Sequence, residues 1–412
     1  MTFLPLLFSV LIATPDAPAP AVDKPAPPTR LQLETVEGTM IEGMLKSIDA
    51  SGVVTLQDVG TEQQVNLNDL TSITVTTFDP TAASNVENNC TLHLPDGGEV
   101  AARLLEGRTG KITVDVGLGS MVPVSLSGLA GVQFNTTSSG ALHSEFQARL
   151  KDRDKGRDLL IAVKDDKPVV LPGALEALDH ESWSFRIGSK VQTGALDRAF
   201  GVVLGGPAAS APAGPVSFSL SGKRRFTASI RSADATSIDV DAGPLGRLAI
   251  AWPQISGIAV RSDRVVYLSD LEPVTIDHRS IYDASWPPKM DRSVTGGPMV
   301  IAGREFDRGV GAHAPTTLTY DLGGAYDSFV SMIGIDDAAG PRGRAVFRVI
   351  CDGRVAFESS PIGHGPAESV RVSLAGVKKM TLDVDPGPDL EISDHCDWAG
   401  ARLIRAKRAG PR

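Results

Sequence analysis

The segment VFRVICDGRVAFES (residues 346–359) predicts a β-hairpin and indicates the fold class of the chain. Apolar and polar residues alternate on both sides of its centre, which is the pattern of strands with one buried face. Between them, Asp352 and Gly353 supply the two positive φ angles that a type I′ turn requires. The segment therefore predicts two antiparallel strands joined by a two-residue turn.

Short runs with a strand-like pattern continue on both sides of this hairpin. Between residues 262 and 406 they are VVYL, MVIAG, TLTYDL, SFVSMIGI, SVRVSL, KMTLDV and ARLI, in addition to the two hairpin strands. About nine short strands in roughly 140 residues are typical of a sandwich of two β-sheets. Residues 262–406 are therefore predicted to form one β-sandwich, followed by a basic tail at 407–412.

Four copies of one pattern precede the predicted sandwich. Windows of 41 residues that span 35–75, 94–134, 164–204 and 220–260 align without gaps. Each window holds strand-like runs separated by polar or glycine-bearing turns. Three of the shared apolar columns contain Ile41, Val100, Val170 and Phe226; Leu67, Leu126, Leu196 and Trp252; and Ile73, Val132, Val202 and Ile258.

The repeated pattern predicts four small all-β units. Four or five strands in such a window have the size of a strongly bent sheet or an SH3/Sm-like barrel. One unit of this size buries little surface, so we expect the units to pack against one another. A propeller of four blades is the competing arrangement. Trp183 and Trp252 occupy strand positions, and we expect both to pack in these small cores.

The remaining segments connect or flank these units. The apolar run from Phe3 to Ala13 is too short to span a bilayer and, with the small residues and prolines after it, resembles a secretory signal peptide. We therefore expect export, with a linker up to residue 29. Two repeat units occupy 30–140, a short amphipathic helix 141–158 and two further units 159–261.

Composition limits the classes of partner. The 412 residues carry a net charge of −9, with a pI near 5.3, which argues against nucleic acid or anionic lipid as the main partner. Three cysteines, Cys90, Cys351 and Cys396, have no metal-ligand spacing, and an odd number excludes a complete disulfide framework. Either Cys351 and Cys396 pair, or all three are free.

The C-terminal region resembles a known family through seven blocks in a fixed order. They are YLSDL (267–271), DRSVTGGP (291–298), RGVGAHA (308–314), YDLGG (320–324), IGIDD (333–337), CDG (351–353) and DHCDWAGARL (394–403). Together they resemble the NPCBM family of carbohydrate-binding modules. The resemblance implies a galactose-binding-domain-like β-sandwich (jelly roll), non-catalytic binding of terminal sugars such as galactose, and a structural calcium ion.

Two further features of the resemblance bear on function. The N-terminal repeats are similar to β-repeat regions that precede this domain in planctomycete-like exported proteins. After YLSDL, sugar-binding members often carry an Asn-Gly-Trp-Gly-like stretch, whereas this chain has IYDASWPPKMDRS. Trp286 takes the place of the family tryptophan in different surroundings.

The stretch DHCDWAGARLI (residues 394–404) gathers candidate sugar-binding residues. Sugar recognition needs an apolar face for C–H groups and short polar side chains for hydroxyls. Trp398 offers the face, and its polar neighbours offer the donors and acceptors. The full candidate set is Trp286, His313, Asp336, Asp337, Asp394, His395, Asp397 and Trp398.

Structural roles compete with this hypothesis. Asp394 and Asp397 can bond backbone N–H groups, Trp398 can pack between the sheets, and His313 can be a buried histidine. Asp336 and Asp337 can hold calcium only if a turn brings both carboxylates to one side, and the metal ligands are not identified. Paired carboxylates also hydrolyse glycosides, but no separation is defined by the sequence.

The sequence thus predicts a non-catalytic, exported glycan-binding protein with repeats as scaffold. The alternative is a structural or adhesive envelope protein whose sandwich contacts another protein.

Overall fold

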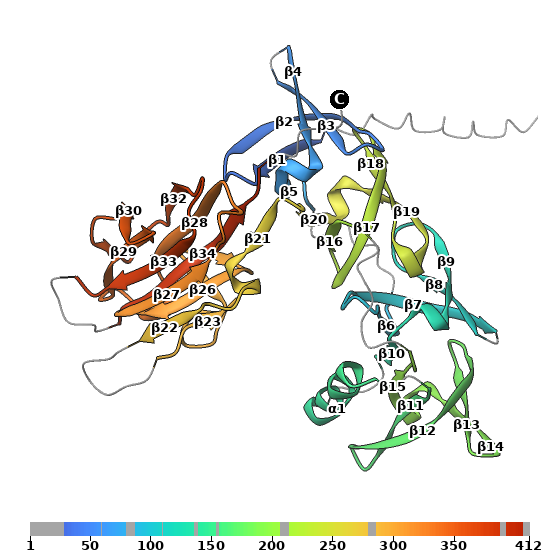
Figure 1. Ribbon diagram of the computed structural model, residues 1–412. Coiled ribbons are helices and arrows are strands. Elements are labelled where there is room, and N and C mark those ends of the chain that lie inside the picture. The colour runs from blue at the N-terminus through green and yellow to red at the C-terminus, as the bar shows by residue number, and fades with distance from the viewer. Residues whose placement is uncertain are drawn as a thin grey trace, which may run out of the picture.

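The computed structural model describes residues 29–58, 60–79, 87–108, 110–135, 139–153, 156–206, 214–278, 286–387 and 393–406. The predicted signal-like segment, most of its linker and the basic tail lie outside these residues. Strands form most of the described structure, with one α-helix and short 3₁₀ turns, so the all-β prediction is confirmed. Figure 1 shows the repeat units, coloured blue to yellow-green, beside the sandwich, coloured yellow to red.

The first repeat unit is an open barrel of five strands. Its sheet order is β5-β1-β2-β3-β4, because the last strand returns to pair with the first. The strands are β1 (Arg30–Thr35), β2 (Met40–Ile48), β3 (Val53–Asp58), β4 (Thr61–Asn66) and β5 (Leu70–Val75). This SH3/Sm-like arrangement is the one that the sequence predicts.

The other three units repeat the same order of strands. Each has five strands, the first of which lies at or before the start of its 41-residue window. The second unit is β6 (Cys90–His93), β7 (Glu99–Arg108), β8 (Lys111–Asp115), β9 (Met121–Ser125) and β10 (Gly131–Phe134). The third is β11 (Asp158–Lys164), β12 (Lys167–Leu178), β13 (Ser182–Ile187), β14 (Lys190–Ala195) and β15 (Ala199–Val203). The fourth is β16 (Val216–Leu220), β17 (Arg224–Ala233), β18 (Ser237–Asp241), β19 (Arg247–Ala251) and β20 (Ile255–Val260).

One apolar column explains why every unit closes in the same way. Leu67, Leu126, Leu196 and Trp252 each open a single 3₁₀ turn just before the last strand. In each turn the residue directly after the turn donates its backbone N–H to the carbonyl of that residue. All four side chains are buried. The column therefore anchors the corner at which the chain leaves the fourth strand and returns to the first.

The units join through their last strands. β5 of the first unit pairs with β20 of the fourth, and β10 of the second pairs with β15 of the third. β17 also pairs with β2 inside the first of these pairs, and its pairing with β7 of the second unit links the two pairs, so that all 20 strands form one hydrogen-bonded sheet. The expected packing is present, but the first and fourth units are partners although they are farthest apart in sequence. The arrangement is not a propeller.

The helix α1 (Gly140–Lys151) packs on the second and third units. It buries Leu142 and Phe146 against Ile161 and Phe200, as the four-residue apolar spacing predicts. Within the described residues, no helix is long and apolar enough to cross a membrane. Trp183 and Trp252 are buried, and each indole N–H donates to a backbone carbonyl, so the prediction of core packing for both is confirmed.

The C-terminal region is a sandwich of two six-stranded sheets. One sheet has the order β23-β26-β34-β28-β32, with β21 also paired to β34, and the other has the order β22-β27-β33-β29-β30, with β31 paired to β29. The first comprises β21 (Val265–Tyr267), β23 (Lys289–Met290), β26 (Gly309–His313), β28 (Ser328–Ile335), β32 (Glu368–Ser373) and β34 (His395–Ile404). The second comprises β22 (Thr275–His278), β27 (Thr316–Asp321), β29 (Arg344–Cys351), β30 (Arg354–Glu358), β31 (Ile362–Gly363) and β33 (Lys379–Asp385).

Two hairpins complete the sandwich. β24 (Met299–Ile301) and β25 (Arg304–Phe306) form a separate two-stranded ribbon. β29 and β30 form the hairpin predicted from residues 346–359, with positive φ at Asp352 and Gly353. Cys90, Cys351 and Cys396 are all free, so Cys351 and Cys396 do not pair.

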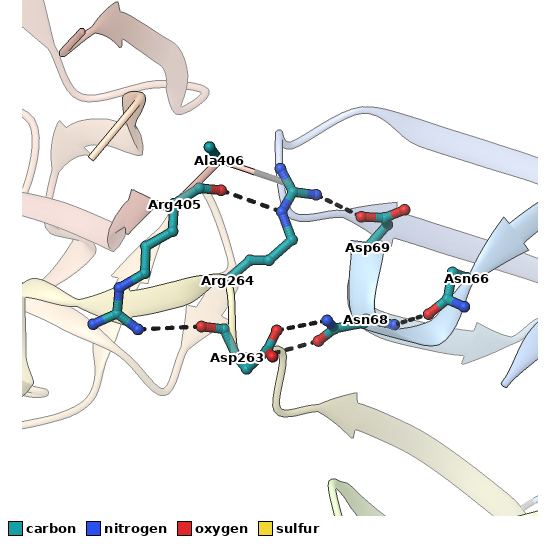
Figure 2. Close-up of a pocket in the computed structure, with 7 residues that line it drawn as sticks. All are labelled: Asn66, Asn68, Asp69, Asp263, Arg264, Arg405 and Ala406. Carbon is teal, nitrogen blue, oxygen red and sulfur yellow. Dashed lines mark hydrogen bonds and ion pairs between the residues drawn. The ribbon is translucent and has the colours of Figure 1, made fainter. Parts of the chain in front are cut away.

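The sandwich is fixed to the first repeat unit through the end of β34. Arg402 is 5% exposed and donates to the carbonyl of Val36 and to the carboxylate of Glu34. Val36 also packs with Val330 and Ile404. Figure 2 shows the polar side of this interface, where Arg264 bonds Asp69 and where Asp263 and Asn68 bond each other. Apolar packing and satisfied charges thus act together at this junction.

Candidate functional site

Three aromatic rings from separate segments meet at the start of β34. His395 is the first residue of β34 and lies opposite His313, the last residue of β26. Trp286, shortly before β23, stacks on His313 with ring centroids 5.4 Å apart and an interplanar angle of 12°. Its ring lies 5.3 Å from that of His395, and the two histidine rings are 5.5 Å apart. We call these three residues the ring cluster.

The ring cluster lies at the opposite end of β34 from the repeat units. The strand has 10 residues, and its last residues, Arg402 to Ile404, are those that contact the first unit. At about 3.3 Å per residue, the two ends are roughly 30 Å apart. Trp286 and His395 are partly exposed, whereas His313 is buried.

The two histidines differ in their hydrogen bonds. Nδ1 of His313 lies 2.7 Å from the carbonyl oxygen of Ala314, which orients the ring. Nδ1 of His395 is buried and has no hydrogen-bond partner in the described part of the chain. Burial lowers the pKa of His395, and the nearby His313 lowers it further. His395 is therefore neutral at neutral pH, and a neutral imidazole can donate or accept a hydrogen bond.

Asp336 and Asp337 hold the β24–β25 hairpin. Asp336 is buried and accepts the backbone N–H groups of Val300 and Ala338. Asp337 accepts those of Ala302 and Gly303. A 3₁₀ turn that begins at Asp337 brings both carboxylates to this hairpin, which supplies the turn that calcium binding would require. Their oxygens are nevertheless engaged with backbone donors.

Asp394 and Asp397 are also buried. Asp394 accepts the backbone N–H of Arg344, as a loop-capping role predicts. Asp397 is 0% exposed in the middle of the central strand β34. Burial, together with the neighbouring carboxylate of Asp336, raises the pKa of Asp397 to about 9. Asp397 is therefore protonated at neutral pH.

The backbone above Asp397 explains its burial. Gly311 and Gly334 are its neighbours on β26 and β28. A Cβ at Gly311 would lie 2.3 Å from the carbonyl oxygen of Arg292, and one at Gly334 would lie 2.7 Å from Ile301. The segment that includes Arg292 and Ile301 thus covers this face of the sheet and excludes ligand from Asp397.

Trp398 belongs to the core of the sandwich. It is 0% exposed and contacts Phe347 in a T-shaped arrangement, with centroids 5.2 Å apart. Because side chains alternate along β34, Trp398 points between the sheets while His395 and Asp397 point away from them. The prediction that Trp398 contacts sugar is wrong, and its structural alternative is correct.

The structure therefore divides the eight candidate residues. Trp286, His313 and His395 come together, while Asp336, Asp394, Asp397 and Trp398 are buried and are unavailable to a ligand in this conformation. Asp337 remains partly exposed beside His364, whose Nε2 lies 3.3 Å from its Oδ1. Sequence reasoning missed His364, because no motif distinguishes it from an ordinary loop histidine.

No metal centre is evident in the residues that the structure describes. Within them, no group of three or more His, Cys, Asp or Glu side chains is arranged to hold a metal ion. Asp336 and Asp337, the candidate calcium ligands, each accept two backbone N–H groups.

Comparison with known families gives the same assignment as the seven sequence blocks. The family model described as the NPCBM/NEW2 domain matches residues 264–404, about a third of the chain. Residues 264–404 are an NPCBM/NEW2 domain. The ring cluster, the four buried candidates and both sheets of the sandwich lie within this domain.

Individual relatives of the NPCBM/NEW2 domain are partial matches. A Renibacterium salmoninarum protein named "Putative endo-alpha-N-acetylgalactosaminidase" is 32% identical over 118 residues, which are 28% of this chain and 8% of that protein. The chain thus spans only a small part of this curated relative.

Solved structures include two from Clostridium perfringens. CBM51 from GH95, in complex with methyl-galactose, is 28% identical and covers 34% of this chain and 99% of its own, with a TM-score of 0.32. The CBM51-2 and INT domains of ZmpB are 23% identical and cover 42% and 38% of the two chains, also with a TM-score of 0.32.

Proposed function

We propose that the NPCBM/NEW2 domain binds a terminal sugar of a glycan at the ring cluster and catalyses no reaction. The family assignment supports carbohydrate as the ligand, and the resemblance implies galactose as the first sugar to test. The observation that carries the proposal is the meeting of Trp286, His313 and His395, with an unpartnered ring nitrogen on His395.

Each ring has a defined part in this proposal. Trp286 stacks on His313 and stays partly exposed, so in this proposal the exposed part of its indole meets sugar C–H groups. The neutral imidazole of His395 exchanges a hydrogen bond with a sugar hydroxyl. His313 positions Trp286, since its own Nδ1 is held by the Ala314 carbonyl.

Binding without hydrolysis agrees with the state of the carboxylates. Hydrolysis of a glycoside needs two carboxyl groups that flank the scissile bond. Asp336, Asp394 and Asp397 are buried, and Asp337 accepts two backbone N–H groups. None of these four is free to act as an acid and base pair on a bound sugar.

The repeat units serve as scaffold in this proposal. Arg402 fixes the sandwich to the first unit at the end of β34 that is remote from the ring cluster. The cluster is then displayed away from the scaffold.

Export, a structural calcium ion and an envelope protein partner remain predictions. Comparing the melting temperature with calcium and with chelator would test the ion, and a rise with calcium is expected.

A glycan array on the full chain tests the proposed function. We expect galactose-terminated glycans to bind, and His395→Ala to weaken them by about 1 kcal/mol, the value of one hydrogen bond. Trp286→Ala should weaken them more, because it removes the apolar face. His180→Ala, an exposed histidine of the third unit, is the matched control. Equal binding by all variants, or no glycan binding, would favour the alternative of protein contact.

A further inference from the structure

A second hollow lies where the fourth repeat unit meets the sandwich. Its volume is about 610 Å³, within the range of small-ligand sites. One wall is built by β16, β17 and β20 of the fourth unit, and the other by Tyr267, Asp270, Asp307 and Arg308 of the sandwich. In Figure 1, β16 and β20 lie beside β21, the first strand of the sandwich. We call this space the junction hollow.

The wall from the fourth unit combines small residues with positive charge. Ser217, Thr227 and Ala259 lie side by side in the register of its three strands. Arg225 and Arg261 also line the hollow, and both are exposed. Side chains of the same parity along each strand share a face, so these five residues form one surface. Its small central residues leave room for a ligand between the two guanidinium groups.

Arg225 and Arg261 differ from the other arginines at the domain junctions. Arg308, on the opposite wall, pairs with Asp270 and Asp291 and stacks on the ring of Tyr267. Arg264, at the hollow in Figure 2, pairs with Asp69 and Glu37. In the described part of the chain, neither Arg225 nor Arg261 has an ion-pair partner or a side-chain hydrogen bond. Two guanidinium groups in one hollow are thus available to a ligand.

We propose that the junction hollow is a second binding site, which takes an acidic saccharide. The planar guanidinium group binds a carboxylate through two parallel hydrogen bonds. Hydroxyl groups of a sugar can bond Ser217 across the small-residue surface, whereas the hydroxyl of Thr227 is held by Asp96. Asp307 is exposed on the opposite wall, where its carboxylate repels a bound anion and limits the affinity of the hollow for it.

Titration of the full chain with digalacturonic acid tests this proposal. We expect saturable binding that Arg225→Gln and Arg261→Gln each weaken about tenfold, the effect of losing a charge-assisted hydrogen bond. Asp307→Asn should strengthen binding, because it removes a negative charge from the hollow. Arg198→Gln, an exposed arginine of the third unit, is the matched control and should leave binding unchanged.

Two further arms make the result decisive. Trp286→Ala should leave digalacturonate binding unchanged, so that this site is separated from the ring cluster. Inorganic sulfate should compete poorly, because it lacks the sugar body. The proposal fails if digalacturonate does not bind, if the double variant Arg225→Gln/Arg261→Gln binds it as wild type does, or if sulfate competes equally well.

Discussion

The two ends of β34 differ in how completely their polar groups are satisfied. At the C-terminal end, Arg402 is buried and its guanidinium is bonded to Glu34 and to backbone carbonyls. At the N-terminal end, His395 is partly exposed and its Nδ1 has no partner in the described residues. Buried polar groups in proteins are normally paired. The paired end therefore indicates structure, and the partly exposed ring of His395, with a nitrogen still to be paired, indicates a place for a ligand.

The difference also shows that residue type alone does not identify function. Trp286 and Trp398 are both tryptophans near the same end of the strand. Trp398 packs between the sheets, whereas Trp286 lies outside them against two histidines. Burial and orientation decide which of the two can meet a sugar, and variants of each residue test this distinction.

The largest effect on stability is expected for Trp398→Ala. Removing a fully buried tryptophan leaves a cavity and should lower the free energy of unfolding by about 3–5 kcal/mol. Trp286→Ala should cost much less stability, because Trp286 is partly exposed. Chemical denaturation of the full chain measures the free energy of unfolding of both variants, provided that the unfolding of the sandwich is monitored. Equal losses would remove the distinction between the two tryptophans.

Arg402→Met is expected to have the next largest effect on the free energy of unfolding. It leaves the Val36 carbonyl and the Glu34 carboxylate without their buried partner, which should cost about 1–3 kcal/mol. Arg304→Met is the matched control, since Arg304 also pairs with Glu34 but is largely exposed and should contribute only about 0–1 kcal/mol. Thermal melting of both variants makes the comparison. Similar melting temperatures would show that the junction does not depend on Arg402.

Asp397→Asn is expected to stabilise the protein at neutral pH. The folded-state pKa is about 9 and the unfolded carboxyl titrates near 3.8, so unfolding releases a proton between these values. The contribution of Asp397 to the free energy of unfolding is therefore fully present below about pH 4, and it is lost as the pH rises towards 9. Asparagine carries no such penalty and should add about 1–3 kcal/mol at pH 7–8. A melting series from pH 4 to 9 should show the gain growing with pH, and a constant difference would contradict the raised pKa.

Acid pH should weaken sugar binding through a smaller effect. The pKa of His395 is lowered below its usual value near 6.5, so the neutral ring persists as pH falls from 8 to 6.5. Affinity should be constant over that range and decline at lower pH, where His395 gains a proton. Calorimetric titration with a galactoside at pH 5, 6 and 7.5 measures the decline, which His395→Ala should abolish. A decline that persists in this variant would assign the titration to another group.

Most of the fold could be predicted from local sequence patterns. Alternation, the Asp352-Gly353 turn and the apolar columns at Leu67 and its equivalents act over a few residues, and the structure has strands and corners at those positions. The partnership of β5 with β20 could not be predicted, because the pairing edges have the same pattern in every unit.

The candidate site was predicted less well, for a physical reason. His313 and His395 were named from motifs, but their meeting depends on the register of β26 against β34. Asp397 and Trp398 carry sugar-binding chemistry in their side chains, and only the cover above Gly311 and the core between the sheets remove them from solvent. Such cover comes from residues far away in sequence.

A crystal structure of the full chain with bound methyl-galactoside tests the central claim most directly. The account predicts the sugar against Trp286, with a hydroxyl within hydrogen-bonding distance of His395 and no contact to Trp398 or Asp397. A sugar bound at another surface while the ring cluster stays empty would contradict it.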